Sequence, residues 1–239
     1  MVSSTIRSGA KAVRRKVFSL LSRLTARQSD PDLQAELQRL DATKTGNSIR
    51  RLTDLQERPG QMRTAWSGLG PIAQALVREH QPHTVVELGS CGGFSACALA
   101  LALKEHVPGG RLYAVDTWNG DPHTGFYDER VYQQFMSFRR ELDLEEIIIP
   151  LRMSFRAARN QIPGRIDLLH IDGWHTFRAV RQDFRSFQPL LAPHALVLFH
   201  DVNTTFLGMR VFWLLASMKY PTATIPYSHG LGVLRWRTP

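Results

Sequence analysis

Four acidic or basic side chains in the second half of the chain could bind a metal ion or accept a proton. They are Asp172 and His175, three residues apart, and the adjacent pair His200 and Asp201. Each pair follows a run of apolar residues that predicts a buried strand, at 166–171 and at 195–199. Carboxylates and imidazoles bind divalent cations, and a histidine that titrates near neutral pH can take a proton from a hydroxyl. The spacing therefore predicts one polar site where two strands end.

A glycine-rich turn lies upstream, between an apolar segment at 84–88 and a run of small residues that begins at Phe94. Such a strand–turn–helix junction offers backbone N–H groups and the positive end of a helix dipole to an anionic ligand. Asp116 ends the next predicted strand, 27 residues after Gly89. A carboxylate there can accept hydrogen bonds from both hydroxyls of a ribose, whereas a local cap is the alternative role.

Four residues of this turn resemble motif I of the class I S-adenosylmethionine (SAM)-dependent methyltransferases, E-x-G-x-x-x-G-x-S. They are Glu87, Gly89, Gly93 and Ser95. The resemblance implies that these residues and Asp116 bind SAM, with Glu87 close to the amino-acid part of the cofactor. From the residues alone, a strand-end acid that accepts backbone N–H bonds is the alternative for Glu87.

Two further residues are cofactor-binding candidates on this resemblance. Trp118 follows Asp116 and is placed to cover the cofactor or the substrate, with packing in the core as the alternative. Ser154 follows the strand predicted at 147–151, where the family places contacts near the adenine. His123, Tyr127 and Tyr132 are candidates to line the acceptor pocket, and exposure to solvent is their alternative.

The acids and histidines at 172–175 and 200–201 resemble a methyltransferase subfamily that methylates sugar hydroxyls on natural products, with relatives in cell-surface glycan pathways. The resemblance implies that His175 is the general base and that Asp172, His200 and Asp201 bind a divalent cation. Some relatives have Glu at the position of His200, so Mg²⁺, a transition metal and no metal all stay open. The residues alone also allow Asp172 to cap a helix near Trp174 and His200 to bond nearby backbone.

Apolar segments that alternate with helical ones predict an α/β fold, a doubly wound Rossmann-like sheet. Five parallel strands are expected at 84–88, 111–116, 147–151, 166–171 and 195–199, and an antiparallel hairpin at 222–225 and 232–236. This plan is that of the class I methyltransferase domain, here at 70–239. A linker or helical lid is expected at 31–69, and a basic amphipathic helix at 1–30.

The positive charge of the chain is concentrated at its N-terminus. The formal net charge is +9, and residues 1–30 hold seven basic side chains against one acidic side chain. This distribution argues against a nucleic-acid groove on the domain itself. Apolar residues recur with helical period in 5–27, which predicts contact with an anionic membrane surface or a partner protein. Packing on its own domain or on a second subunit, and an organelle presequence, are the alternatives.

The remaining composition bears on where the protein is found. Two cysteines, Cys91 and Cys97, are poorly spaced for a disulfide, and no apolar run approaches the ~20 residues needed to span a bilayer. We therefore expect a cytoplasmic protein, with peripheral membrane attachment through 5–27 as the alternative.

Together these patterns predict a SAM-dependent O-methyltransferase that acts on a hydroxyl of a sugar or glycosylated acceptor, a small molecule or a glycan. The alternative is a non-catalytic SAM-fold module in a glycan-assembly complex. A nicotinamide-dependent oxidoreductase is disfavoured because the turn reads G-x-x-G-G, whereas a dinucleotide fingerprint reads G-x-G-x-x-G.

Overall fold

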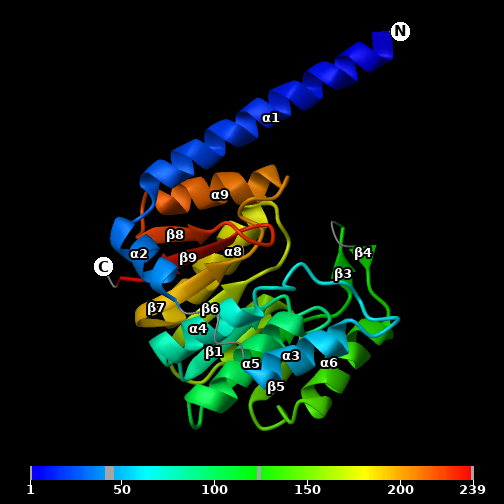
Figure 1. Ribbon diagram of the computed structural model, residues 1–239, viewed down its shortest axis with the longest axis vertical. Helices are drawn as coiled ribbons and strands as arrows, with labels where there is room; N and C mark the ends of the chain where they lie inside the picture. Colours follow the sequence, from blue (N-terminus) through cyan, green and yellow to red (C-terminus); the bar gives the residue numbers. More distant parts are fainter. Residues whose placement is uncertain (1, 41–45, 123–124, 238–239) are drawn as a thin grey trace.

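The computed structural model of the chain describes residues 2–40, 46–122 and 125–237, with the side chains of the first helix described from residue 14. Its centre is a seven-stranded sheet in the order β5-β2-β1-β6-β7-β9-β8 (Figure 1). The strands are β1 (Thr84–Leu88), β2 (Arg111–Asp116), β5 (Ile148–Arg152), β6 (Ile166–Ile171), β7 (Leu191–Phe199), β8 (Thr222–Ile225) and β9 (Leu231–Arg235). The first five are parallel, and β9 runs antiparallel to both β7 and β8. The predicted doubly wound sheet with a terminal hairpin is confirmed.

Strand boundaries agree with the predictions except at three places. The strand predicted at 195–199 begins at Leu191, because Leu191 already pairs with Ile166 ahead of an irregularity in the β6–β7 register. The segments predicted at 147–151 and 232–236 lie one residue later and one residue earlier, at 148–152 and 231–235.

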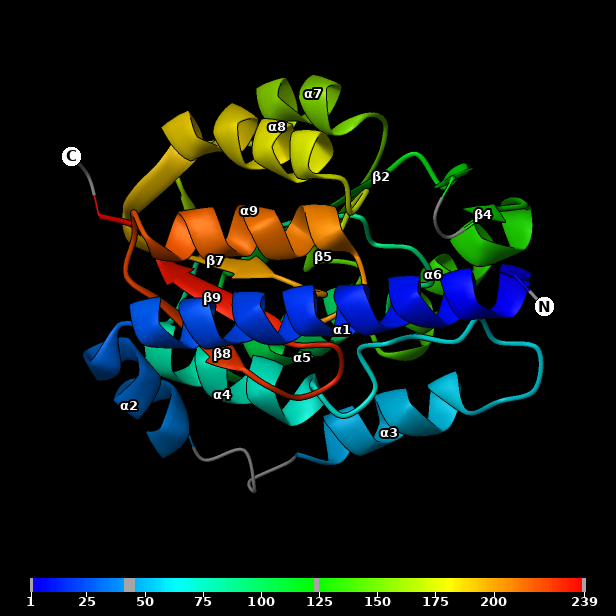
Figure 2. The same ribbon diagram turned by 90° about the horizontal axis from the view of Figure 1, so that it is seen from above.

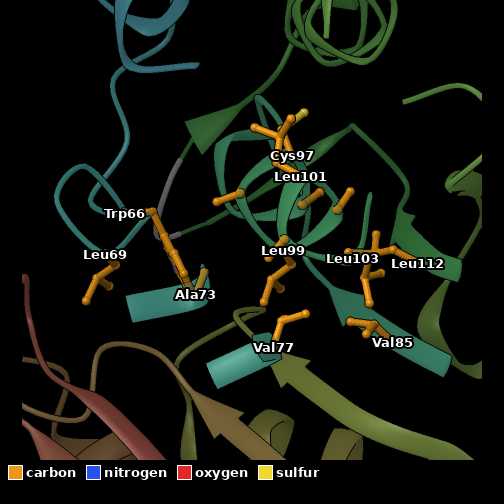
Figure 3. Close-up of a cluster of buried hydrophobic side chains, with 14 of the residues drawn as sticks. Trp66, Leu69, Ala73, Val77, Val85, Cys97, Leu99, Leu101, Leu103 and Leu112 are labelled. Atoms are coloured by element: carbon orange, nitrogen blue, oxygen red, sulfur yellow. The ribbon is translucent and has the colours of Figure 1, made fainter. Parts of the chain in front are cut away.

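Helices cover both faces of the sheet (Figure 2). One face carries α3 (Asn47–Gln56), α4 (Gly70–His80), α5 (Phe94–His106) and α6 (Glu129–Glu141), and the other carries α7 (Phe155–Ala158), α8 (Phe177–Phe187) and α9 (Leu207–Ser217). Successive residues of a strand point to opposite faces, so Val85 enters the first core and Val86 the second. Figure 3 shows Val85 in the first core together with Leu103 and Leu112, and Trp66 beside Ala73 in the same cluster.

The segment expected to be a linker or lid contains two helices that pack on the domain. Asp30 caps α2 (Pro31–Arg39) by accepting a hydrogen bond from the N–H of Leu33 at 2.9 Å. α2 lies beside β8, and α3 lies beside α5 with Leu52 fully buried. These residues therefore enlarge the core, while the division of the chain at 30 and 69 stays a prediction.

The basic N-terminal segment forms α1 (Val2–Gln28), which lies along α9, and its first turns extend beyond the rest of the chain (Figure 1). The contact with α9 agrees with the alternative in which this helix packs on its own domain. Among the described residues, no helix combines the length and the apolar character needed to cross a membrane. A two-stranded sheet, β3 (Gly120–Asp121) and β4 (Gly125–Phe126), follows β2, and 3-10 turns lie at Arg159–Gln161 and Gln188–Leu190.

Candidate functional site

A cavity of about 410 Å³ lies at the carboxyl ends of β1, β2, β6 and β7. This is the edge of a parallel sheet where ligands bind in open α/β folds. The cavity brings together nine of the predicted site residues: Gly89, Gly93, Ser95, Asp116, Ser154, Asp172, His175, His200 and Asp201. The predicted cofactor turn and the predicted acid–histidine site therefore share one cavity.

The glycine turn is held against the tip of β6. Gly89 has φ +98°, and a Cβ at this position would lie 2.2 Å from the carbonyl oxygen of Asp172. The carbonyl of Leu88 accepts a hydrogen bond from the N–H of Asp172 at 2.9 Å. Gly93, with φ +89°, is the N-cap residue that precedes α5. Only glycine adopts this backbone next to so close a neighbour at low cost, so the turn fixes Asp172 relative to the cofactor loop.

Asp116 is fixed at the cavity wall by two backbone hydrogen bonds. Its Oδ2 accepts from the N–H of Cys91 at 2.9 Å, and its Oδ1 accepts from the N–H of Trp118 at 2.8 Å. Burial raises the pKa of this carboxyl, and the two amide donors oppose that effect. A carboxylate oxygen has a further lone pair, so both oxygens can still accept from a ligand.

Two predicted cofactor residues do not line the cavity. Glu87 is fully buried, and its Oε1 lies 3.0 Å from Nδ1 of His170, so its partner is a side chain and not backbone N–H. The ring of Trp118 stacks on Phe135 with centroids 5.2 Å apart, and its Nε1 donates to the carbonyl of Cys91 at 2.8 Å. Trp118 thus packs in the core, and a direct cofactor contact for either residue stays a prediction.

The four acid and histidine side chains form a compact cluster, which we call the acid–histidine cluster. Nε2 of His175 lies 2.8 Å from Oδ2 of Asp201 and 3.5 Å from Oδ1 of Asp172. Nδ1 of His200 lies 3.3 Å from Oδ2 of Asp172 and 3.5 Å from Oδ2 of Asp201. Each imidazole therefore bridges both carboxylates.

The alternative role of Asp172 as a helix cap is wrong. The helix after β6 begins at Phe177, and its cap is Thr176, whose Oγ1 accepts from the N–H of Ala179 at 3.2 Å. His200 does bond nearby backbone, because its Nε2 lies 3.0 Å from the carbonyl of Ser228 and must donate to it. Its Nδ1 consequently faces the two carboxylates.

Charge balance holds the cluster together. Burial would lower the pKa of each imidazole, but Asp172 and Asp201 outweigh it and raise the pKa of His175 to about 9 and that of His200 to about 10. Burial opposes ionisation of both carboxyls, yet the histidines keep the pKa of Asp172 and of Asp201 below the usual value. Near pH 7 without a metal, two protonated imidazoles therefore face two carboxylates.

The donor set fits a divalent cation. Asp172, His175 and Asp201 each offer one ligand atom, and these atoms lie within 4.8 Å of one another. Oxygen and imidazole donors suit a borderline metal as well as a hard one. This geometric group contains His175 in place of the predicted ligand His200, whose assignment stays a prediction.

Sequence reasoning missed His229, on the loop between β8 and β9. Its Nδ1 lies 3.1 Å from Oδ1 of Asp201. Residues 62–66, inside the segment predicted as a linker or helical lid, also line the cavity, although sequence reasoning singled out none of them. Of the pocket candidates, Tyr127 lines the cavity and Tyr132 packs edge-on against Trp118, while His123 lies outside the described residues. No local pattern marks His229, because only the fold brings it to Asp201.

The sequence of this chain is similar to those of known proteins over most of the residues that line the cavity. The sequence model of a family described as a methyltransferase domain matches residues 86–202. An uncharacterized protein of Sinorhizobium fredii, y4gI, is 36% identical over 176 residues, which make up 72% of this chain and 19% of that protein. The chain thus spans about a fifth of the length of this curated relative.

Solved structures share the fold. The O-methyltransferase from Bacillus cereus, in complex with SAH, has a TM-score of 0.60 at 16% identity and covers 81% of this chain and 92% of its own. A second structure is TomG of Streptomyces achromogenes, an O-methyltransferase involved in tomaymycin synthesis, in complex with SAM. It has a TM-score of 0.60 at 14% identity, and the match covers 90% of this chain and 99% of TomG. The family match and this fold confirm the predicted resemblance to the class I SAM-dependent methyltransferases, while the motif assigned to the glycine-rich turn stays a prediction.

Proposed function

We propose that this protein, whose residues 86–202 match the model of a methyltransferase domain and whose fold is of class I, transfers a methyl group from SAM to a hydroxyl of a sugar or glycosylated acceptor. The observation that carries the proposal is the single cavity that joins the turn at 89–95 and Asp116 to the acid–histidine cluster. Methyl transfer needs a cofactor site and a deprotonating site side by side, and the proposed residues for both line this one cavity.

The residues present fit SAM. The two oxygens of Asp116 are placed to accept from two ribose hydroxyls, and the N-terminus of α5 opens toward the same cavity. Oγ of Ser90 is buried at the cavity without a hydrogen-bond partner in the described chain, so a polar ligand atom there would satisfy it. Ser154 lines the wall between β5 and α7 and is proposed to lie near the adenine.

His175 is proposed to accept the proton of the acceptor hydroxyl. SAM, when bound, supplies an electrophilic methyl carbon on a positively charged sulfur. His175 lies in the same cavity, and its Nε2 can take the hydroxyl proton once that nitrogen is unprotonated. Asp172 and Asp201 hold the imidazole in place and stabilise its positive charge after the transfer.

The carboxylates also favour a sugar acceptor. The carboxylate oxygens of Asp172 and Asp201 offer acceptor atoms to neighbouring hydroxyls, as a sugar diol requires, while His200 stays a predicted metal ligand. A divalent cation, when bound there, would supply positive charge that orients the diol and lowers the pKa of the reacting hydroxyl.

Calorimetry with SAM and with NAD tests the cofactor, and mass spectrometry of the purified protein tests for carried-over SAM or its demethylated product. We expect SAM to bind and NAD not to bind; the reverse result would exclude the proposal. Turnover is then measured with methyl-labelled SAM and a panel of glycosides. A protein that binds SAM but methylates no acceptor would favour the alternative of a non-catalytic module.

A further inference from the structure

A second cavity, which we call the α1 groove, lies next to the acid–histidine cluster. Its volume is about 780 Å³. Its lining comes from α1, from the segment after β6 and from residues 205–208, and it includes Val17, Phe18, His175, Phe177, Phe206 and Leu207. Most of these side chains are apolar or aromatic, so the α1 groove suits a hydrocarbon group.

Helix α1 is anchored as the outer wall of this groove. Nη2 of Arg14 donates to the carbonyl of Thr205 at 2.9 Å. Arg210 is buried, and its Nη2 donates to the carbonyl of Phe18 at 2.8 Å while its guanidinium lies over the Phe18 ring. Since two arginines tie α1 to α9 and the loop before it, the groove is a built feature of the fold.

The inner wall depends on a glycine. A Cβ at Gly208 would lie 2.4 Å from the backbone N of Phe177 and 2.9 Å from the carbonyl oxygen of His175. The start of α9 therefore packs directly on the backbone of 175–177. This contact brings Leu207 to the groove beside Phe177.

The groove adjoins the proposed reaction site at His175. His175 lines both cavities, and its ring stacks on Phe206 with centroids 4.6 Å apart and 7° between the planes. Several of the exposed large apolar residues border this junction: Val17, Phe177 and Leu207 line the groove, and Trp174 lines the first cavity. Exposed apolar residues gathered at one place mark a binding surface more often than scattered ones do.

We infer that the α1 groove binds the alkyl chain of an amphiphilic acceptor whose hydroxylated head lies at the acid–histidine cluster. This inference rests on the proposed function and names the acceptor class for the same site. An alkyl chain is favoured because the groove lies between a helix and two loops, is apolar, and reaches the cluster at His175. A polar sugar alone would leave these side chains in water.

Binding of alkyl glucosides to the SAH-loaded full-length chain tests the inference. Methyl, hexyl and octyl β-D-glucoside are titrated below the micellar concentration. Each buried methylene strengthens binding up to about 4-fold, so the octyl compound should bind at least about 5-fold more tightly than the hexyl one. Equal affinities for the methyl and octyl compounds would overturn the inference.

Two variants test whether the alkyl chain of the ligand binds in the groove. Leu207→Asp and Val17→Asp put a charge on its walls, and each should weaken octyl glucoside binding by about 10-fold or more while leaving SAH affinity unchanged. Leu20→Asp is the matched control, because Leu20 is 57% exposed on the same helix and outside the groove lining. A control that loses as much affinity as the two groove variants would contradict the assignment.

The remaining outcomes separate this inference from its alternatives. Sedimentation that shows a dimer dissociated by Leu207→Asp but not by Leu20→Asp would mean that a second copy fills the groove, which overturns the inference. SAH binding without chain-length dependence would also overturn it and leave the proposed function intact. Failure of both SAM and SAH to bind would count against the proposed function itself.

Discussion

At the scale of single residues, Asp116 tests the cofactor side of the site. Asp116→Asn keeps the shape of the side chain but removes the charge that strengthens two ribose hydrogen bonds, so we expect SAH affinity to fall by about 10–100-fold in calorimetry. Asp167→Asn is the control, because Asp167 also accepts two backbone N–H bonds, from His83 and Thr84, away from the cavity. Equal affinity losses in both variants would mean that Asp116 acts only through the fold.

His175 tests the reaction side. His175→Ala should leave SAM affinity unchanged and lower turnover by about 10²–10⁴-fold, because the hydroxyl then loses its proton acceptor. His83→Ala, at an exposed position remote from the cavity, should change neither quantity. Loss of SAM binding in His175→Ala would place the imidazole with the cofactor and not with the acceptor.

Metal dependence is decided at the same residues. With two carboxylates and two imidazoles within reach of one another, the cluster can bind a divalent ion only after protons leave the imidazoles. We expect a chelator to lower turnover and added Mg²⁺ or Mn²⁺ to restore it, with SAM affinity unchanged. Full turnover after chelation would remove the metal from the proposal.

Asp183 on α8 gives a pH-dependent stability. Burial raises the pKa of its carboxyl from 3.8 to about 7, so the folded state holds this proton more tightly than the unfolded chain. The stability that this proton contributes is full below the unfolded pKa and is lost as pH rises through about 7. Asp183→Asn removes the titration, and its free energy of unfolding relative to wild type should be about 1–3 kcal/mol larger near pH 8 than near pH 5. Urea denaturation of both proteins at both pH values measures this difference. The same difference in free energy of unfolding between variant and wild type at pH 5 and at pH 8 would contradict the prediction.

At the scale of elements, the contact between the β1 turn and the tip of β6 ties the two halves of the site together. Gly89→Ala adds strain at φ +98° and a Cβ 2.2 Å from the carbonyl oxygen of Asp172. We expect a loss of about 3 kcal/mol or more in stability, together with weaker SAM binding. Gly164→Ala is matched, since Gly164 has φ +74° but no described atom lies within 4 Å of where its Cβ would be, so it should lose only about 1 kcal/mol.

The elements themselves were largely predictable from the sequence. Strands such as 84–88 and 166–171 are short apolar runs between turn residues, and this local pattern is sufficient to place them. The role of 31–60 was not predictable, because an amphipathic pattern indicates that one helix face is covered but not which element covers it, and only the fold shows that Leu33 and Leu52 enter the core. Long-range contacts of this kind leave no local signal.

The same distinction applies to the candidate site. The positions of Asp116, Asp172 and Asp201 at the ends of predicted parallel strands were sufficient to predict that they lie close together, because parallel strands end at one edge of the sheet. The direction of Glu87 follows from strand alternation: it faces the same side as Val85, and its register partner is His170.

At the scale of the whole molecule, charge and shape are both asymmetric. The basic α1 lies along α9 (Figure 2) and extends beyond the domain (Figure 1). Its exposed side chains include Arg15, Lys16 and Arg23. The predicted contact with an anionic membrane surface would bring the α1 groove close to acceptors that carry alkyl chains. The position of the helix is thus consistent with both its charge and the proposed acceptor class.

Vesicle binding tests this arrangement. Each basic side chain near an anionic surface contributes about 1 kcal/mol, so replacing Arg15, Lys16 and Arg23 with Gln should weaken binding to phosphatidylserine vesicles by about 100-fold at low salt, and less as salt is raised. Replacing Arg178, Arg181 and Arg185 with Gln removes the same net charge from exposed positions on α8 and should have a much smaller effect. If the two triple variants lose affinity equally, the attraction depends on net charge alone. If neither loses any, α1 has a protein partner or only packs on its own domain, because a helix that does not respond to lipid charge cannot be holding the domain at an anionic surface.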